Sequence, residues 1–224
     1  MSKKRAVVLL SGGLDSATCL FWAKDKGYAL EALTVHYGQR HDRELTSARR
    51  LAKAAGAHLH AVKLPLPWLK TSSLVNKEKS LPNIPLSKIG TGGIPSTYVP
   101  GRNTIFVALG VSLADAVGAE CVVIGANALD YSGYPDCRPD FFRAFSTVAR
   151  LGTKRGDQHK GLGIKTPLAR KNKAAVVRLA NRLGVPLQWT WSCYSGGKKP
   201  CGTCDSCKLR AKGFEEARME DPAL

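Results

Sequence analysis

AVVLLSGGLDSATCLFWAK, residues 6–24, contains an apolar run typical of a buried strand, a turn rich in glycine and serine, and a helical pattern. The paired glycines let backbone N–H groups approach an anion, and the helix N-terminus adds unpaired donors and a partial positive charge. Ser11 and Ser16 add hydroxyl donors. The carboxylate of Asp15 would repel a phosphate unless a Mg²⁺ ion bridges the two. The stretch therefore predicts a phosphate site that works with magnesium.

This turn differs from two common nucleotide-binding loops. It is shorter than a Walker P-loop, lacks the Gly-Lys-Ser/Thr ending, and does not match the Gly-x-Gly-x-x-Gly dinucleotide fingerprint. It resembles the SGGxDS loop of the PP-loop ATP pyrophosphatases, which bind the β,γ-pyrophosphate of ATP and cleave at the α-phosphate. The alternative is an ordinary strand-to-helix turn. The resemblance implies that ATP and its Mg²⁺ are bound by Ser11, Gly12, Gly13, Leu14, Asp15 and Ser16.

Length and charge limit the class of protein. A chain of 224 residues can form one domain with a full core. The formal charge of +17 fits either a nucleic-acid partner or a basic enzyme with an anionic substrate. Lys and Arg are scattered, although they dominate residues 41–55, residues 169–184 and the tail after Cys201. This scatter favours the enzyme, with no obligatory nucleic acid.

Neither a membrane span nor a secretory signal is expected. No apolar run approaches the roughly 20 residues needed to cross a bilayer, and the basic N-terminus runs directly into the first strand. The seven cysteines are odd in number and unevenly spread, unlike a secreted disulfide framework. We therefore expect a cytoplasmic protein.

Apolar strands alternate with helical patterns along residues 1–190, which we assign to one ATP-binding domain. Alternation of this kind predicts an α/β fold with a doubly wound, mostly parallel sheet and helices on both faces. Residues 65–101 are rich in proline, glycine and serine, and we expect them to form an insertion or a mobile lid. The predicted strands are 6–10, 29–36, 58–64 and 121–125, and the predicted helices are 17–24, 41–56, 104–117 (with Asn103 as N-cap) and 169–183.

Four cysteines crowd the C-terminal segment 191–224, which we assign to the same domain. They are Cys193, Cys201, Cys204 and Cys207. Cys-x-x-Cys turns direct two sulfurs to one centre, which suits a tetrahedral, structural Zn²⁺ with a closed coordination shell. An Fe–S cluster, a redox pair and buried thiols without metal are the alternatives.

The matching residues extend well beyond the first loop. They are residues 11–16, VHYGQRH at 35–41, YVPGRN at 98–103, GANALDYSGYPDCR at 125–138, KTPL at 165–168, and WSCY at 191–194 with the cysteine cluster. Together they resemble the 7-cyano-7-deazaguanine synthase family, the nitrile-forming enzymes of the queuosine pathway, over almost the whole chain. The resemblance implies an adenine-nucleotide α-hydrolase-like fold. It also implies that 7-carboxy-7-deazaguanine is adenylated by ATP, converted to an amide by ammonia, and dehydrated to the nitrile with a second ATP.

The resemblance also suggests roles for polar residues near the strand ends. Lys165 and Arg102 are candidate catalytic cations that stabilise charge at the α-phosphate, with solvated surface cations as the alternative. Three residues follow the second strand and are expected on the adenine and ribose side of ATP, although His36 fits a satisfied, partly buried histidine nearly as well. These three are His36, Tyr37 and Gln39.

The loop after the fourth strand is the candidate substrate site. A carboxylate can accept hydrogen bonds from the amide N–H and exocyclic amine of a deazaguanine, and Asp130 and Asp136 are available. Tyr131 and Tyr134 can stack on the ring, and Arg138 can pair with the substrate carboxylate. The alternative is an ordered turn with exposed tyrosines.

Two other function classes stay open. A PP-loop enzyme that modifies tRNA would explain the positive charge, but the length leaves no room for an RNA-binding appendage. A zinc-bearing nucleic-acid adaptor has no need of the metal ligand Asp15. The length also leaves no room for a glutaminase domain, so ammonia is expected from solution or from a partner. The family resemblance further suggests a homodimer.

Overall fold

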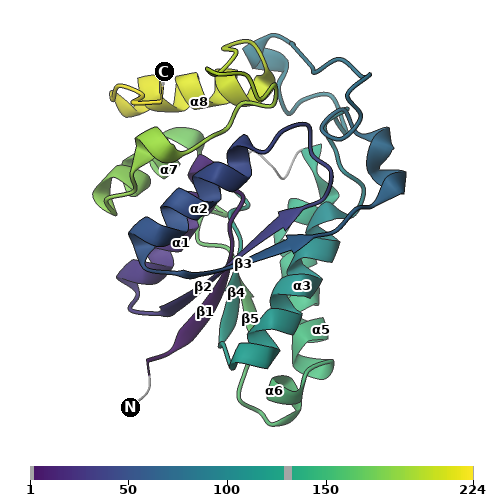
Figure 1. The fold of residues 1–224 in the computed structure, drawn as a ribbon, viewed down its shortest axis with the longest axis vertical. Helices are drawn as coiled ribbons and strands as arrows, with labels where there is room; N and C mark the ends of the chain where they lie inside the picture. The colour runs from purple at the N-terminus through teal and green to yellow at the C-terminus, as the bar shows by residue number, and fades with distance from the viewer. Residues whose placement is uncertain (1–2, 129–132, 224) are drawn as a thin grey trace.

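The computed structural model describes residues 3–128 and 133–223. At its centre lies a parallel sheet of five strands in the order β3-β2-β1-β4-β5 (Figure 1). The order reverses direction at β1, as in doubly wound sheets, so the predicted α/β fold class is confirmed. The strands are β1 (Arg5–Leu9), β2 (Ala29–His36), β3 (His58–Lys63), β4 (Cys121–Val123) and β5 (Gly163–Lys165).

Helices cover both faces of the sheet (Figure 1). Successive side chains of a strand point to opposite faces, so Ala6 and Val8 join one apolar core and Val7 and Leu9 join the other. The first core packs against α1 (Leu14–Asp25), α2 (Arg43–Ala55), α7 (Lys173–Arg182) and α8 (Asp205–Ala217). The second packs against α3 (Arg102–Val117) and α5 (Pro139–Leu151), and the short α6 (Lys154–Asp157) follows α5.

Several predicted boundaries are wrong. The helix predicted from residue 104 begins at Arg102, so Asn103 lies in its first turn and Gly101, at φ 61°, precedes it. The helix predicted from residue 169 begins at Lys173, because the Asn172 side chain accepts a 2.9 Å hydrogen bond from the backbone N–H of Ala175 and caps the helix there. Helices α5, α6 and α8 and strand β5 were not predicted.

Residues 65–101 connect the edge strand β3 to α3 and contain neither a strand nor an α-helix. Short 3-10 turns form at Pro67–Thr71 and Leu86–Lys88. The ammonium of Lys208 on α8 donates to the side-chain oxygen of Asn83 at 2.6 Å and to the carbonyl of Ile84 at 2.7 Å. The predicted lid motion of this segment stays a prediction.

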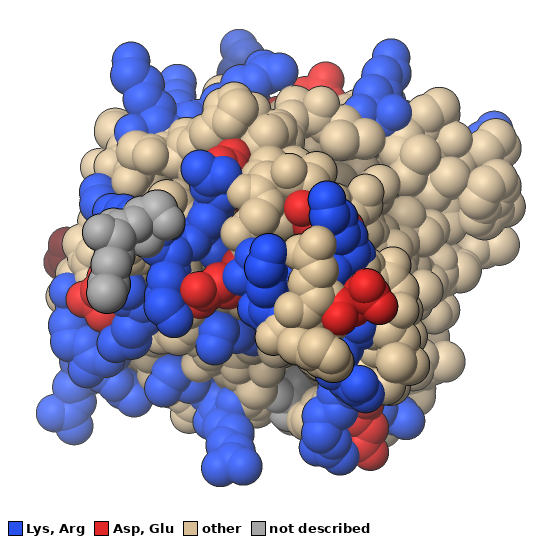
Figure 2. Space-filling model, turned by 90° about the horizontal axis from the view of Figure 1, so that it is seen from below, with Lys and Arg blue, Asp and Glu red and all other residues tan. Residues whose placement is uncertain are grey.

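Basic side chains are spread over the surface. Figure 2 shows Lys and Arg side chains distributed across one face, with acidic side chains among them. None of the helices in the described part of the chain combines the length and apolar character needed to cross a lipid bilayer.

Candidate functional site

A cavity of about 300 Å³ opens at the carboxyl ends of β1, β2 and β4. This is where a doubly wound sheet places its ligands, next to the point at which the strand order reverses. Its walls come from the β1–α1 loop, the loop after β2, the first turns of α3 and α7, and residues 191–194. Of the predicted site residues, it is lined by Ser11, Gly13, Leu14, Asp15, Ser16, Tyr37, Gln39, Arg102 and Tyr134.

The β1–α1 loop is held in shape by its own serine. The Ser16 hydroxyl accepts hydrogen bonds from the backbone N–H groups of Ser11 and Gly12, each at 3.2 Å, and donates to the carbonyl of Gly13 at 3.1 Å. Gly12 has φ 95°, and a Cβ there would lie 2.2 Å from the carbonyl oxygen of Glu44. Only glycine therefore fits this position, where the loop passes directly against α2.

The carboxylate of Asp15 is held by a cation and an amide. The Lys173 ammonium lies 2.7 Å and 3.0 Å from its two oxygens, and the Asn127 side-chain amide donates to it at 3.0 Å. Both Asp15 and Lys173 are about four-fifths buried. Neither Lys173 nor Asn127 was selected from the sequence. Asn172 marks a helix start in the sequence, but only the fold brings the first turn of this helix, with Lys173, to the cavity.

Arg102, Tyr37 and Glu44 also line the cavity. Burial acts to lower the pKa of Arg102, but the Tyr37 oxygen and the Cys137 sulfur outweigh it and raise the pKa, so the guanidinium stays charged. Burial raises the pKa of the Tyr37 phenol, although Arg102 opposes it. Burial also raises the pKa of Glu44 from 4.5 to about 7, with Arg102 again opposing. This buried carboxyl was not selected from the sequence.

Five of the described residues that were predicted to bind ATP or substrate or to act in catalysis lie outside the cavity lining, and Gly12 and Asp136 are two of them. His36 ends β2, and its Nε2 lies 3.1 Å from an oxygen of the exposed Asp42. Lys165 ends β5 with an exposed side chain. Arg138 is exposed just before α5. The ATP, phosphate and substrate roles of these residues stay predictions.

The predicted substrate loop is described only in part. Asp130 and Tyr131 lie outside the described residues. The Tyr134 hydroxyl is hydrogen bonded to the Thr97 hydroxyl at 2.8 Å, and Tyr134 lines the cavity. Asp136 is buried instead in the α3 N-terminus, where its carboxylate accepts a 2.9 Å hydrogen bond from the backbone N–H of Asn103. The structure thus gives this carboxylate a capping contact away from the lining.

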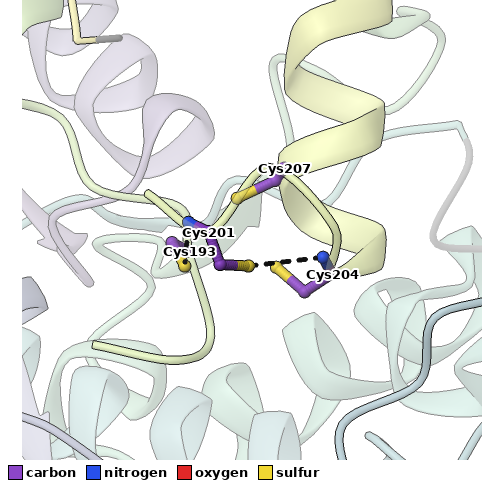
Figure 3. A group of neighbouring side chains, drawn as sticks. All are labelled: Cys193, Cys201, Cys204 and Cys207. Atoms are coloured by element: carbon purple, nitrogen blue, oxygen red, sulfur yellow. Dashed lines mark hydrogen bonds between the residues drawn. The ribbon is translucent and has the colours of Figure 1, made fainter. Parts of the chain in front are cut away.

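The four C-terminal cysteines converge (Figure 3). Their sulfurs all lie within 4.8 Å of one another. Backbone N–H groups of Ser195 and Cys201 point to the Cys193 sulfur at 3.4 and 3.3 Å. A hydrogen bond from Cys207 lowers the pKa of Cys204 to about 5. Clustered sulfurs with N–H donors around them match a tetrahedral zinc site, so these residues fit the predicted metal.

The cysteine segment is fastened to the first loop. The backbone N–H of Trp191 donates to the Gly12 carbonyl at 3.0 Å. The Cys193 carbonyl accepts from the Trp191 indole at 2.8 Å and faces the His41 Nε2 at 2.9 Å. Burial lowers the pKa of His41, so the ring is neutral near pH 7. The metal segment and the phosphate loop therefore form one wall.

Residues 5–218 match the sequence model of a family described as queuosine biosynthesis protein QueC. Two similar relatives are both called 7-cyano-7-deazaguanine synthase. The one from Thermoplasma acidophilum is 49% identical over 222 residues, covering 99% of this chain and 92% of the relative. The one from an Anaeromyxobacter species is 50% identical over 223 residues, covering 99% of this chain and 96% of the relative.

Solved structures resemble the chain at the level of the fold. The NMN synthetase of Francisella tularensis aligns with a TM-score of 0.53 and 16% identity, covering 97% of this chain and 79% of the other. A predicted subunit of tRNA methyltransferase from Methanocaldococcus jannaschii aligns with a TM-score of 0.52 and 16% identity, covering 99% of this chain and 91% of the other.

Proposed function

The chain belongs to the QueC family of queuosine biosynthesis proteins, and on this premise we propose that it converts 7-carboxy-7-deazaguanine and ammonia to 7-cyano-7-deazaguanine with consumption of ATP. The observation that carries the proposal is the Ser11–Ser16 loop at the carboxyl ends of the central strands. This loop opens into a cavity that also holds a buried cation, Arg102.

The first step joins two anions, so the cavity must offset their repulsion. The substrate carboxylate attacks the α-phosphate, an acyl-adenylate forms, and pyrophosphate leaves on the Ser11–Ser16 loop. Asp15 would hold a Mg²⁺ ion, which neutralises charge on the β- and γ-phosphates. Lys173 lies 2.7 Å from Asp15 and is positioned to stabilise the phosphate charge on that side. Arg102 supplies a second cation to the cavity lining.

The second step requires neutral ammonia, because ammonium has no lone pair with which to attack the adenylate. Glu44 lines the cavity, and burial raises its pKa to about 7. A carboxyl with this pKa is suited to accept a proton near neutral pH. We assign Glu44 as the acceptor of the proton that ammonium loses. Ammonia displaces AMP from the adenylate and gives the amide. The amide oxygen then attacks the α-phosphate of a second ATP and pyrophosphate leaves. Departure of AMP, which carries that oxygen, and loss of two protons from the nitrogen give the nitrile.

Substrate recognition remains with the residues after β4. Tyr134 is the described member at the cavity wall and is suited to stack on the purine ring. Asp130, Tyr131 and Arg138 keep their proposed roles toward the base and the carboxylate.

We extend the proposal to a structural Zn²⁺ on the cysteine cluster and to a cytoplasmic homodimer. The four converging sulfurs support zinc. Val148 and Leu151 on α5 are exposed apolar side chains, 57% and 72% accessible, and they support a protein contact there. The four cysteines of the cluster form no disulfide, as is usual in a reducing compartment.

The test is product analysis by mass spectrometry with ATP, Mg²⁺, ammonium and 7-carboxy-7-deazaguanine. AMP together with the nitrile is expected. AMP without the nitrile would point to another carboxylate or to tRNA, and no AMP at all would favour a binding module. Lys173→Met should lower the rate at least about a hundredfold, in the range typical of removing a charge-stabilising group. The control Lys53→Met alters an exposed lysine of α2 and should leave the rate unchanged.

A further inference from the structure

A second group of metal-ligating side chains lies at the sheet edge, away from the cavity. Glu31 on β2 is the register partner of His58 on the edge strand β3, and His60 follows two residues later. Because side chains alternate along a strand, His58 and His60 lie on the same face. The three residues lie toward the amino ends of their strands, whereas the cavity lies at the carboxyl ends.

Both imidazoles direct a nitrogen at one carboxylate oxygen. Glu31 Oε2 lies 2.8 Å from His60 Nε2 and 3.2 Å from His58 Nδ1, and all three ligand atoms lie within 4.8 Å of one another. A tetrahedral zinc ion with bonds of about 2.1 Å separates its ligands by roughly 3.4 Å. The observed spacing therefore needs only small shifts to hold a metal ion.

The carboxylate is already fixed for this geometry. Arg5 Nε lies 3.4 Å from the other oxygen, Oε1, and the Arg5 guanidinium also donates to the Val117 carbonyl at 2.6 Å. Arg5 thus acts on one oxygen and leaves Oε2 facing the two rings. Outer contacts of this kind orient metal-ligating carboxylates.

Access differs among the three ligands in the way an open metal site requires. The Glu31 side chain is 11% exposed and the His60 side chain 27%, whereas His58 is 73% exposed. Glu31 and His60, the less exposed ligands, are fixed within the sheet, and His58 lies on the solvent side of the site. Two imidazoles and one carboxylate form a borderline donor set, which suits Zn²⁺ and neighbouring divalent transition metals and disfavours Mg²⁺ and Ca²⁺.

We propose that Glu31, His58 and His60 form a second metal site, which binds Zn²⁺ or a similar divalent transition ion with the remaining coordination position open to solvent. The ion cross-links β2 to the edge strand β3. It is independent of the four-cysteine cluster and of the reaction in the cavity.

The test is a zinc count on the full chain. Protein with its cysteine cluster loaded is dialysed against micromolar Zn²⁺, and bound zinc is measured by mass spectrometry of the metal. The wild-type chain should bind two zinc ions. His58→Gln, an exposed substitution that leaves the core intact, should lower the affinity for the second ion at least about tenfold, because even outer contacts are worth that much.

His60→Gln should do the same, and the control His159→Asn, at an exposed position far along the chain with φ 54°, should not. Circular dichroism verifies the fold of each variant, and AMP formation by His58→Gln should equal that of the wild type. A wild-type chain that binds one zinc ion, or a His58→Gln variant that still binds two with unchanged affinity, would overturn the proposal.

Discussion

Glu44→Gln offers a quantitative test of the charge balance inside the cavity. Burial raises the pKa of Glu44 from 4.5 to about 7. Between these two pH values the folded protein keeps a proton that the unfolded chain has released. Because the folded state binds more protons in this window, the free energy of unfolding falls as the pH rises through it. The stabilising proton is fully retained only at low pH, which is opposite to the usual behaviour of a salt-bridged carboxylate.

The magnitude follows from the two pKa values. They differ by about 2.5, and each pKa unit corresponds to about 1.4 kcal/mol. Across the whole titration the free energy of unfolding therefore falls by about 3.4 kcal/mol. Roughly 0.8 kcal/mol of this is already lost at pH 5, which leaves about 2.5 kcal/mol between pH 5 and pH 8. The amide introduced by Glu44→Gln does not titrate. From pH 5 to pH 8, the free energy of unfolding of the variant should therefore rise by about 2.5 kcal/mol relative to that of the wild type.

The assay is urea unfolding followed by circular dichroism, at pH 5 and pH 8, for both proteins. Titration of the cysteine cluster affects both chains equally and cancels in the difference. Glu215→Gln, which alters an exposed residue of α8, is the matched control and should run parallel to the wild type. Parallel pH profiles for Glu44→Gln and the wild type would refute the reasoning, because they would mean that Glu44 carries no burial penalty.

Three other substitutions address the frame around the cavity. Cys204→Ser should lose the metal and lower the melting temperature, because a structural metal contributes folding free energy. Full metal occupancy with an unchanged melting temperature would contradict this prediction. Arg210→Met should cost about 3–5 kcal/mol in urea unfolding, because it leaves the carboxylate of Asp221, 4% exposed, without its cation; a loss below about 1 kcal/mol would argue against a tightly coupled pair. Gly12→Ala should cost at least about 1–3 kcal/mol and abolish AMP formation, whereas Gly92→Ala, which meets open space, should be neutral in both assays.

The fold was predictable where the sequence carries long periodic signals. Strands β1 to β4 were found because each is an apolar or alternating run next to a turn signal. Strand β5 was missed because three residues, Gly163–Lys165, are too few to display a period. Helix α5 was not predicted, although the sequence carries two helix signals there: Pro139 stands at the first position, and Phe142 and Ala149 lie on one buried face.

Site residues were predictable where they form a motif that is contiguous in the sequence. They were less predictable where the tertiary structure brings one of many similar residues into the cavity. The Ser11–Ser16 loop is local, so its position at a helix N-terminus follows from the sequence. Lys173 is one of 34 basic residues, and nothing in its spacing distinguishes it from those that face solvent. Asp136 was predicted to bind the substrate, but its carboxylate instead accepts a hydrogen bond from the backbone N–H of Asn103 and caps α3.

The position of the cysteine cluster explains why a small ATP-using domain ends in a metal site. A cavity between the strand ends and the helix N-termini needs a wall, and residues 191–194 supply it from a part of the chain with little regular structure. Such a segment lacks the hydrogen bonds of a helix or strand that would offset its conformational entropy. The convergence of the four cysteine sulfurs holds this segment on one side. The hydrogen bond from the Trp191 N–H to the Gly12 carbonyl holds it against the phosphate loop. Metal loss should therefore weaken binding at the phosphate loop before it unfolds the sheet, because the loop and the metal segment share that contact while the strands do not.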